Sequence, residues 1–311
     1  QKDKETYLYR MTYNIKEDNA DTTKKAVVPK GAEVLLESRY PYLDDSQIRY
    51  ILYSTAVSSG YSVLDDAEGW GRLNLFEAAN GYGAFDTNVT VNMDASKGGF
   101  NVADNWKNDI SGTGSLTKEG SGMLVLSGNN SYTGNTIVDG GSIRADYASA
   151  FGNSSIVNNS VINENTDDTL IINGNYKQNK SGVLELTISN ENDYVDITGN
   201  AELGGKLVLN FKDYIPSTDA EIIKCASVAS QFDEIEINAP EGFEGKIAYN
   251  DNGVDLVFSQ KTDNNTAQNE ISSPQTGDTS HVVMAFTAFV LSLAGILTAS
   301  FASKIKSDRI R

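Results

Sequence analysis

Few side chains in this sequence could perform acid–base or nucleophilic chemistry. The 311 residues include one histidine, His281, and one cysteine, Cys225. Ser-His-Asp hydrolysis, phosphohistidine chemistry and histidine-rich zinc sites each need a placed imidazole, and His281 borders a long apolar run. Cys225 has no cysteine to pair with, and its strand-like surroundings predict a small buried side chain. We therefore predict no catalytic, cofactor-binding or metal-binding residue in this chain.

One group of carboxylates stands close together in the sequence. Asp65, Asp66 and Glu68 lie on an expected loop beside Gly69. Such a group could bind calcium or act as a glycosidase pair, but adjacent acids beside a glycine are more common in a solvated turn. The glycines at Gly112-x-Gly114 and at 204–205 lack the spacing of nucleotide-binding loops and are interpreted as turns.

The composition indicates a chain that can build hydrophobic cores and argues against nucleic-acid binding. A hydrophobic content of 39% is enough to build cores, and 311 residues allow two modules with appendages. The net charge of −17 argues against nucleic-acid binding, which depends on Lys and Arg contacts to phosphates. We expect no nucleic-acid partner and no cofactor.

Residues 1–86 have helical patterns. Ala32–Arg39 predicts a short helix that ends before Pro41. Asp44 and Gln47 form a capping-box pair at the start of an amphipathic second helix, and a third helical turn follows near 73–79. Because helices this small need a partner to build a core, we interpret residues 1–86 as the helical tail of a larger upstream domain.

The sequence pattern of residues 87–258 predicts β-structure throughout. Between Gly112 and Ala145, short β-type runs are separated every several residues by Gly, Asn and Ser. Runs this short cannot each bury a face alone, so we predict a parallel β-solenoid of stacked coils. Asn252-Gly253 is a strong hairpin signal near the end of this region, where we expect a closing module to protect the last coil from edge pairing.

The end of the chain has a tripartite order. A polar linker at 259–273 precedes Pro274, Gln275, Thr276, Gly277 and Asp278. An apolar run at 282–302 follows, and then a basic tail. About twenty apolar residues can cross a bilayer, so we predict one C-terminal transmembrane helix at 282–302. The predicted fold class is thus mainly β, a parallel β-solenoid or β-helix preceded by a small helical remnant and followed by this helix.

Three resemblances add to this interpretation. The stretch GTGSLTKEGSGMLVLSGNNSYTGNTIVDGGSIRA, residues 112–145, resembles the autotransporter-associated β-strand repeat, which implies a scaffold and not a chemistry. The segment 32–85 resembles the end of bacterial acid phosphatases of the type 2 phosphatidic acid phosphatase superfamily. Residues 33–56 and 69–78 also resemble subtilisin-like surface proteases. Neither resemblance includes catalytic motifs, so the catalytic residues of either enzyme are expected upstream of this fragment.

The tripartite end resembles the Gram-positive cell-wall sorting signal. That resemblance implies cleavage between Thr276 and Gly277 by a sortase transpeptidase, attachment to peptidoglycan, and a membrane-inserted C-terminus during sorting. The expected function is therefore the surface stalk and cell-wall anchor of an exported acid phosphatase, on the cell wall of a Gram-positive bacterium. This chain alone is predicted to be inactive. A non-enzymatic adhesin or spacer and the C-terminal part of a subtilisin-like protease are the alternatives.

Overall fold

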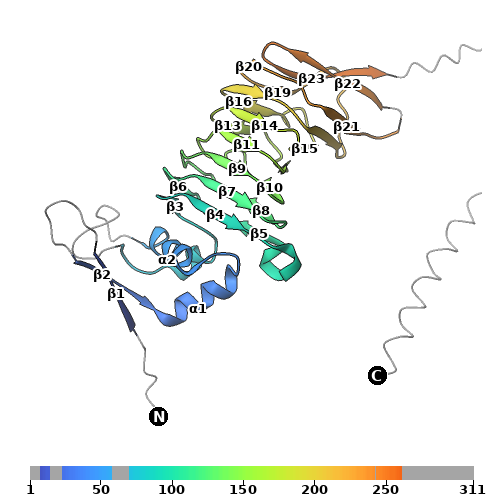
Figure 1. Cartoon of the computed structure of the whole chain (residues 1–311). Helices are drawn as coiled ribbons and strands as arrows, with labels where there is room; N and C mark the ends of the chain where they lie inside the picture. The colour runs from blue at the N-terminus through green and yellow to red at the C-terminus, as the bar shows by residue number, and fades with distance from the viewer. Residues whose placement is uncertain (1–7, 15–22, 58–69, 242, 261–311) are drawn as a thin grey trace, which may run out of the picture. The chain divides into compact units, whose positions relative to one another are not determined.

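A computed structural model describes residues 8–14, 23–57, 70–241 and 243–260 (Figure 1). The fold is mainly β, a parallel solenoid with a small helical N-terminal part, as the sequence predicts. Strands β1 (Leu8–Asn14) and β2 (Thr23–Pro29) form an antiparallel hairpin before the helices. Across the described residues, no helix is long and apolar enough to cross a membrane, and the predicted span at 282–302 lies outside them.

In the described residues before the solenoid, three helices are present: α1 (Lys30–Arg39), α2 (Asp45–Ser54) and the single turn α3 (Leu75–Ala78). The predicted capping box is present at α2, where the Asp44 carboxylate accepts from the Gln47 amide and the Gln47 side chain accepts from the Asp44 amide. The buried face of α2 is formed by Ile48, Ile51 and Leu52. This face packs into the same hydrophobic core as the first coils.

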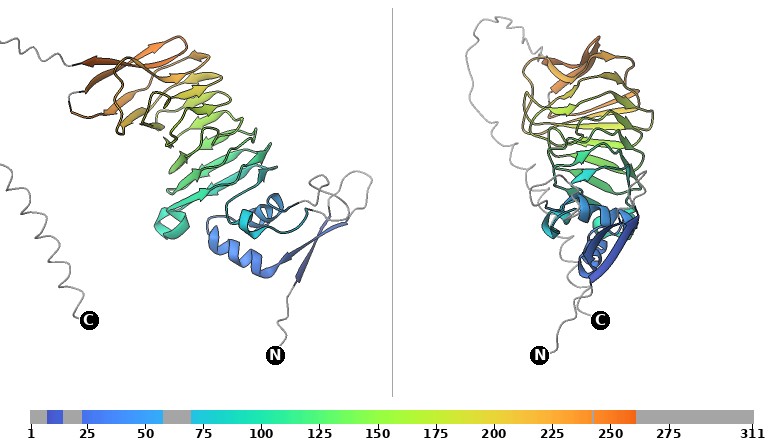
Figure 2. Two further views of the ribbon diagram at one scale, coloured as in Figure 1. Left: turned by 180° about the vertical axis from the view of Figure 1, so that it is seen from behind. Right: turned by 90° about the vertical axis from the view of Figure 1, so that its left-hand side faces the viewer.

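Two seven-stranded parallel sheets run along the solenoid (Figures 1 and 2). The β5–β21 sheet contains β5 (Ala103–Trp106), β8 (Met123–Leu126), β10 (Ser142–Ala145), β12 (Val161–Glu164), β15 (Val183–Ile188), β18 (Lys206–Phe211) and β21 (Glu234–Asn238). The β4–β20 sheet contains β4 (Val89–Asn92), β7 (Leu116–Glu119), β9 (Thr136–Val138), β11 (Ile156–Asn158), β14 (Tyr176–Gln178), β17 (Asn200–Glu202) and β20 (Ser227–Val228). A short parallel pair, β3 (Ala84–Phe85) with β6 (Ser111–Gly112), accompanies the first coil. Two 3-10 turns, Ala95–Lys97 and Gly99–Asn101, separate β4 from β5.

The first three coils are of nearly equal length, the later ones are longer, and the added residues build a third sheet. Equivalent positions in the β5–β21 sheet are Ala103, Met123, Ser142, Val161, Val183, Lys206 and Glu234. The spacing is 20 residues from Ala103 to Met123 and 28 from Lys206 to Glu234. The third sheet has the order β13 (Leu170–Ile172), β16 (Val195–Ile197), β19 (Ala220–Lys224), β23 (Gly253–Gln260) and β22 (Phe243–Asn250).

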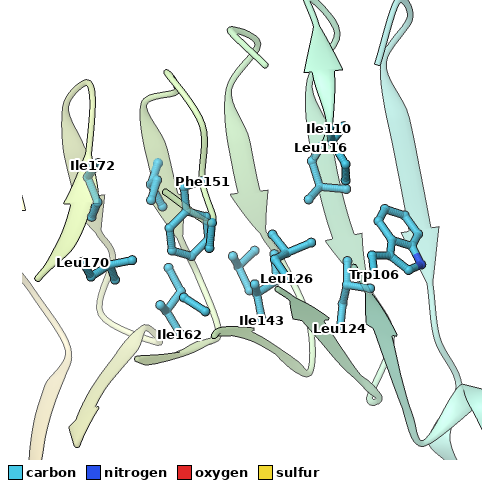
Figure 3. Packing of buried hydrophobic residues seen from close by; sticks show 14 of the residues in the cluster. Trp106, Ile110, Leu116, Leu124, Leu126, Ile143, Phe151, Ile162, Leu170 and Ile172 are labelled. Atoms are coloured by element: carbon cyan, nitrogen blue, oxygen red, sulfur yellow. The ribbon is translucent and has the colours of Figure 1, made fainter. Parts of the chain in front are cut away.

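The core consists of columns of inward-facing side chains (Figure 3). Leu124, Ile143, Ile162, Leu184 and Leu207 occupy equivalent positions in successive coils, and each is buried. Burial alternates along strands such as β10 and β15, because successive side chains in a strand point to opposite faces. Each coil therefore adds its inward side chains to one continuous hydrophobic core.

Buried polar side chains tie successive coils together. The Asn130 side chain accepts from the Ile110 amide (2.8 Å) and donates to the Ala150 carbonyl (2.6 Å). Lys118 is fully buried, and its ammonium donates to the carbonyls of residues 119, 120 and 140. These contacts give buried backbone groups at or beside the corners a hydrogen-bond partner.

Glycine is required where a corner of one coil lies against the backbone of the coil before. A Cβ added at Gly122 would lie 2.0 Å from the Asn101 carbonyl oxygen, and one at Gly128 would lie 1.9 Å from that of Asn108. No side chain fits at such distances. The recurrent glycines of the repeat are therefore explained by stacking distance.

The predicted hairpin near the end is present, with β22 and β23 paired antiparallel around a turn at 251–252. It closes the third sheet only, by adding to β19. Among the described strands, β21 and β20 remain the last strands of the two long sheets. The expected protection of the last coil from edge pairing thus applies to one of its three sides.

Candidate functional site

Most residues that the sequence analysis considered for chemistry lie outside the described residues. This applies to Asp65, Asp66 and Glu68, to the segment Pro274–Asp278, and to His281. Within the described part of the chain, no group of three or more His, Cys, Asp or Glu could hold a metal ion. Cys225 is described, and it is buried as predicted, with burial raising the pKa of its thiol.

A buried polar cluster joins the helices to the first coil. Asp104 lies at an inward-facing position of β5, in register with Leu124, and its side chain is 1% exposed. Its carboxylate accepts from the Arg39 guanidinium (2.5 Å), the Tyr42 hydroxyl (2.5 Å) and the Asn105 amide (2.7 Å). The end of α1 and the loop after it thus supply the partners that a buried carboxylate requires.

The pKa shifts of Arg39 and Tyr42 are those expected beside a buried carboxylate. Burial lowers the pKa of the Arg39 guanidinium, but the hydrogen bond and charge of Asp104 outweigh it, and the net shift is upward. Burial and the neighbouring carboxylate hold the pKa of Tyr42 well above its ordinary value. Both groups therefore keep one protonation state at neutral pH, which suits a structural connection and not proton transfer.

Aromatic side chains surround this pair. The Trp106 ring is fully buried, lies 5.1 Å from Tyr82 and 6.3 Å from Phe85 between ring centroids, and donates from its indole nitrogen to the Tyr42 hydroxyl (3.0 Å). Tyr132 of the following coil lies 5.0 Å from Phe85. The aromatic core is thus continuous from the helical part into the solenoid.

Further hydrogen bonds connect the two parts. The Gln47 side chain donates to the Thr90 carbonyl (2.7 Å), and the Tyr50 hydroxyl donates to Asp86. The Asn108 side-chain amide donates to the Glu77 and Gly81 carbonyls (2.8 and 2.9 Å). We call the contacts of Arg39, Tyr42, Asp104 and Trp106, with those described in this paragraph, the helix–solenoid junction.

A shallow groove of about 510 Å³ lies beside the junction. Arg39, Lys107 and Arg144 line it, together with Phe100 and Met123. Arg39 stacks on the Phe100 ring at 4.2 Å and is paired with Asp104, while Arg144 is paired with Asp146 (2.6 Å). Among the described residues that line the groove, none is a Ser, Thr, Cys or His that could act as a nucleophile or imidazole base.

Sequence analysis did not find the junction. Asp104 stands one position before Asn105 in the run ADNW, where alternation places an acid on the same face as Trp106. An acid at an inward strand position signals a buried partner. The partner is Arg39, 65 residues earlier, and this separation left it without any local signal.

A second buried carboxylate makes solenoid stability depend on pH. Glu164 is 3% exposed and is paired in register with the buried Ala145 of the coil before. Its carboxylate accepts from the Thr166 amide (2.5 Å) and the Thr187 amide (3.2 Å). Burial raises its pKa to about 7, the amide hydrogen bonds oppose this, and nearby Asp193 adds to it. The folded state therefore holds a proton that the unfolded state releases above its ordinary pKa of about 4.3.

We expect the free energy of unfolding to fall as pH rises from about 4.5 to about 7, by on the order of 2–3 kcal/mol from this group. Glu164→Gln should remove this contribution and leave a variant more stable than the parent at pH 7.5. Urea unfolding at pH 4.5 and pH 7.5 measures it, with Glu185→Gln as control. An unchanged pH dependence in Glu164→Gln would contradict the assignment.

Comparison with known proteins identifies the repeat. The family model of the passenger-associated-transport repeat matches residues 116–145, within the stretch that the sequence analysis singled out. This match confirms the autotransporter-associated repeat and covers β7 to β10 of the solenoid.

Longer matches extend beyond the repeat. The chain is 35% identical over 194 residues to the neisserial autotransporter lipoprotein NalP of Neisseria meningitidis, which covers 60% of this chain and 17% of that protein. It is 31% identical over 160 residues to an extracellular serine protease of Serratia marcescens, covering 42% of this chain and 15% of that protein. A match to the adhesin BmaC autotransporter of Brucella suis is 51% identical over 47 residues, 15% of this chain and 1% of that protein. The chain thus spans about a sixth or less of the length of these relatives.

These findings correct four expectations from the sequence. The resemblance to a phosphatase was wrong, and with it the function as anchor of an acid phosphatase, because the matching proteins are autotransporters and an extracellular protease. The sortase and peptidoglycan partners and the Gram-positive cell wall were also wrong, since the relatives are autotransporters and an extracellular protease of the Gram-negative bacteria Neisseria, Brucella and Serratia. The assignment of Pro274, Gln275, Thr276, Gly277 and Asp278 as a cleavage segment lies outside the described residues and is untested. By its repeat and by its long matches, the chain is similar to autotransporter proteins.

Proposed function

We propose that this chain belongs to the passenger region of an exported surface protein, and that its solenoid is the stalk of a serine protease domain in the same polypeptide. The length of the matches supports the protease over other passengers. The match to the Serratia serine protease extends over 160 residues, whereas the match to the Brucella adhesin extends over 47. A 47-residue match is little longer than the 30 residues that the repeat itself occupies.

The helix–solenoid junction is the observation that carries the proposal. A stalk holds a domain in a fixed orientation only when the two share a packed interface. Here Asp104 of the first coil accepts from Arg39 and Tyr42 of the helical part, and Trp106 packs among aromatic rings of both. Residues 33–56 and 69–78, which resemble subtilisin-like proteases, belong to this same helical part. The junction would therefore hold a protease domain directly on the solenoid.

Labelling with a fluorophosphonate probe tests this function. We expect the full-length polypeptide to react with the probe and to hydrolyse casein, and we expect the probe to block that hydrolysis. The 311-residue chain alone should do neither, since its one histidine is His281. A full-length polypeptide that neither reacts nor hydrolyses casein would refute the protease.

The second candidate is a non-enzymatic adhesin, which the 51% identity to the Brucella adhesin favours. In that case the solenoid surface itself would be the functional part. The same labelling experiment separates the two, because an adhesin would bind cells or matrix without reacting with the probe.

A further inference from the structure

The last strand of the β5–β21 sheet has an unpaired edge among the described residues. β21 pairs with β18 in parallel register from Glu234 opposite Lys206 to Asn238 opposite Asn210. On its other side the sheet order ends. The β22–β23 hairpin does not pair with this edge, because it adds to β19 in the third sheet.

The backbone of β21 shows which groups face this edge. The Glu234 amide donates to the Gly205 carbonyl (3.0 Å) on the β18 side. Amides alternate in direction along a strand, so those of Ile235 and Ile237 point to the open side. The open edge therefore offers a row of donors and acceptors with the spacing of one more strand.

The side chains of β21 also suit pairing with a further strand, because apolar residues of its inner face are partly exposed. Ile235 is in register with Leu207, which is fully buried, yet Ile235 is 38% exposed. Ile237, in register with the buried Leu209, is only half-buried. On the outer face, Glu234 and Glu236 share one cation, Lys206, at 2.7 Å each. The edge thus has an apolar inner face and an acidic outer face.

These features favour one kind of occupant. A second copy of β21 would place the glutamates of the two strands opposite each other, and like charges on paired strands are destabilising. A strand with basic residues on its outer face and aliphatic residues on its inner face would match the glutamates and the isoleucines of β21. We propose that the β21 edge binds an extended segment of another protein in which basic and aliphatic residues alternate.

Such binding is β-augmentation, in which backbone hydrogen bonds give affinity and alternate side chains give specificity. It differs from the general attraction of a basic peptide to a protein with a net charge of −17. The alternation of the peptide, and not its charge alone, must therefore decide the affinity. This feature makes the proposal testable with peptides of identical composition.

The test uses the full chain and three fluorescent peptides. The first is Lys-Ile-Lys-Ile-Lys-Thr, the second has the same residues in the order Lys-Lys-Lys-Ile-Ile-Thr, and the third replaces each lysine by glutamate. We expect the alternating basic peptide to bind about tenfold more tightly than the other two, as two or three favourable cross-strand pairs would produce. On binding, the Ile235 and Ile237 amides should become protected from hydrogen exchange.

Variants locate the site. Ile235→Asp places a charge on the inner face and should weaken binding at least about tenfold, since a buried unpaired carboxylate is costly. Glu234→Gln with Glu236→Gln should weaken it severalfold. Glu37→Gln with Glu191→Gln removes the same number of exposed acids elsewhere and should leave binding unchanged. An unchanged melting temperature of each variant shows that the fold is retained.

Three results would overturn the proposal. Equal affinity for the two basic peptides would mean non-specific attraction. Protection of the Ile235 and Ile237 amides in the chain without peptide would mean that the edge is already occupied. A dimer in sedimentation experiments that Ile235→Asp dissociates would mean that a second copy is the partner.

Discussion

Replacing Trp106 by alanine should lower the free energy of unfolding by about 3–5 kcal/mol, the usual cost of removing a buried tryptophan. The ring is fully buried between Tyr82 and Phe85 and donates a hydrogen bond to the Tyr42 hydroxyl. Its loss would open a cavity where the helices meet the first coil. Urea unfolding of the 311-residue chain measures the change.

Phe76→Ala is the matched control, because Phe76 is also an aromatic residue of the helical part but is 76% exposed. Its replacement should change stability by less than about 0.5 kcal/mol. A loss below about 1 kcal/mol for Trp106→Ala would show that the aromatic core at the junction contributes little to the fold.

Replacing Asp104 by alanine should cost about 3–5 kcal/mol, because it removes one partner of a buried ion pair and leaves the other charge uncompensated. Arg39 would lose its carboxylate partner, and Tyr42 would lose the acceptor of its hydroxyl. Urea unfolding again measures the loss. A double variant, Arg39→Met with Asp104→Ala, should recover part of it, since no unpaired charge then remains.

An exposed ion pair provides the control for this variant. Lys177 and Glu202 are each about half exposed and form a pair on the solenoid surface. Glu202→Ala should cost less than about 1 kcal/mol, because solvent screens exposed pairs. If Asp104→Ala costs no more than Glu202→Ala, the junction pair is not a determinant of stability, and the stalk proposal loses its structural basis.

The resemblance of the helical segment 32–85 to acid phosphatases led to the wrong enzyme family, for an identifiable reason. The segment 32–85 contains a capping box, small apolar helices and a glycine-rich turn. These features specify how the helices fold and pack, and none of them takes part in chemistry. The comparisons instead show similarity to autotransporter proteins and to an extracellular serine protease.

The sequence by itself determined the local structure of this protein. Alternation of apolar and polar residues in runs such as VLELTI, with glycine and asparagine recurring between the runs of the repeat, indicates stacked strands, since strands so short bury one face only when they stack. The capping-box pair Asp44 and Gln47 indicated the start of α2. The dipeptide Asn252-Gly253 indicated the β22–β23 hairpin. Each of these depends on residues that are neighbours in the chain.

Only the tertiary structure decided the features that depend on distant residues. The pairing of Arg39 with Asp104 joins positions 65 residues apart, and no local pattern connects them. Coils that grow from 20 to 28 residues add a third sheet, which period-two patterns do not distinguish from longer corners. The open edge of β21 follows from the pairing of β23 with β19, because a strand is an edge only by virtue of where its neighbours lie in space.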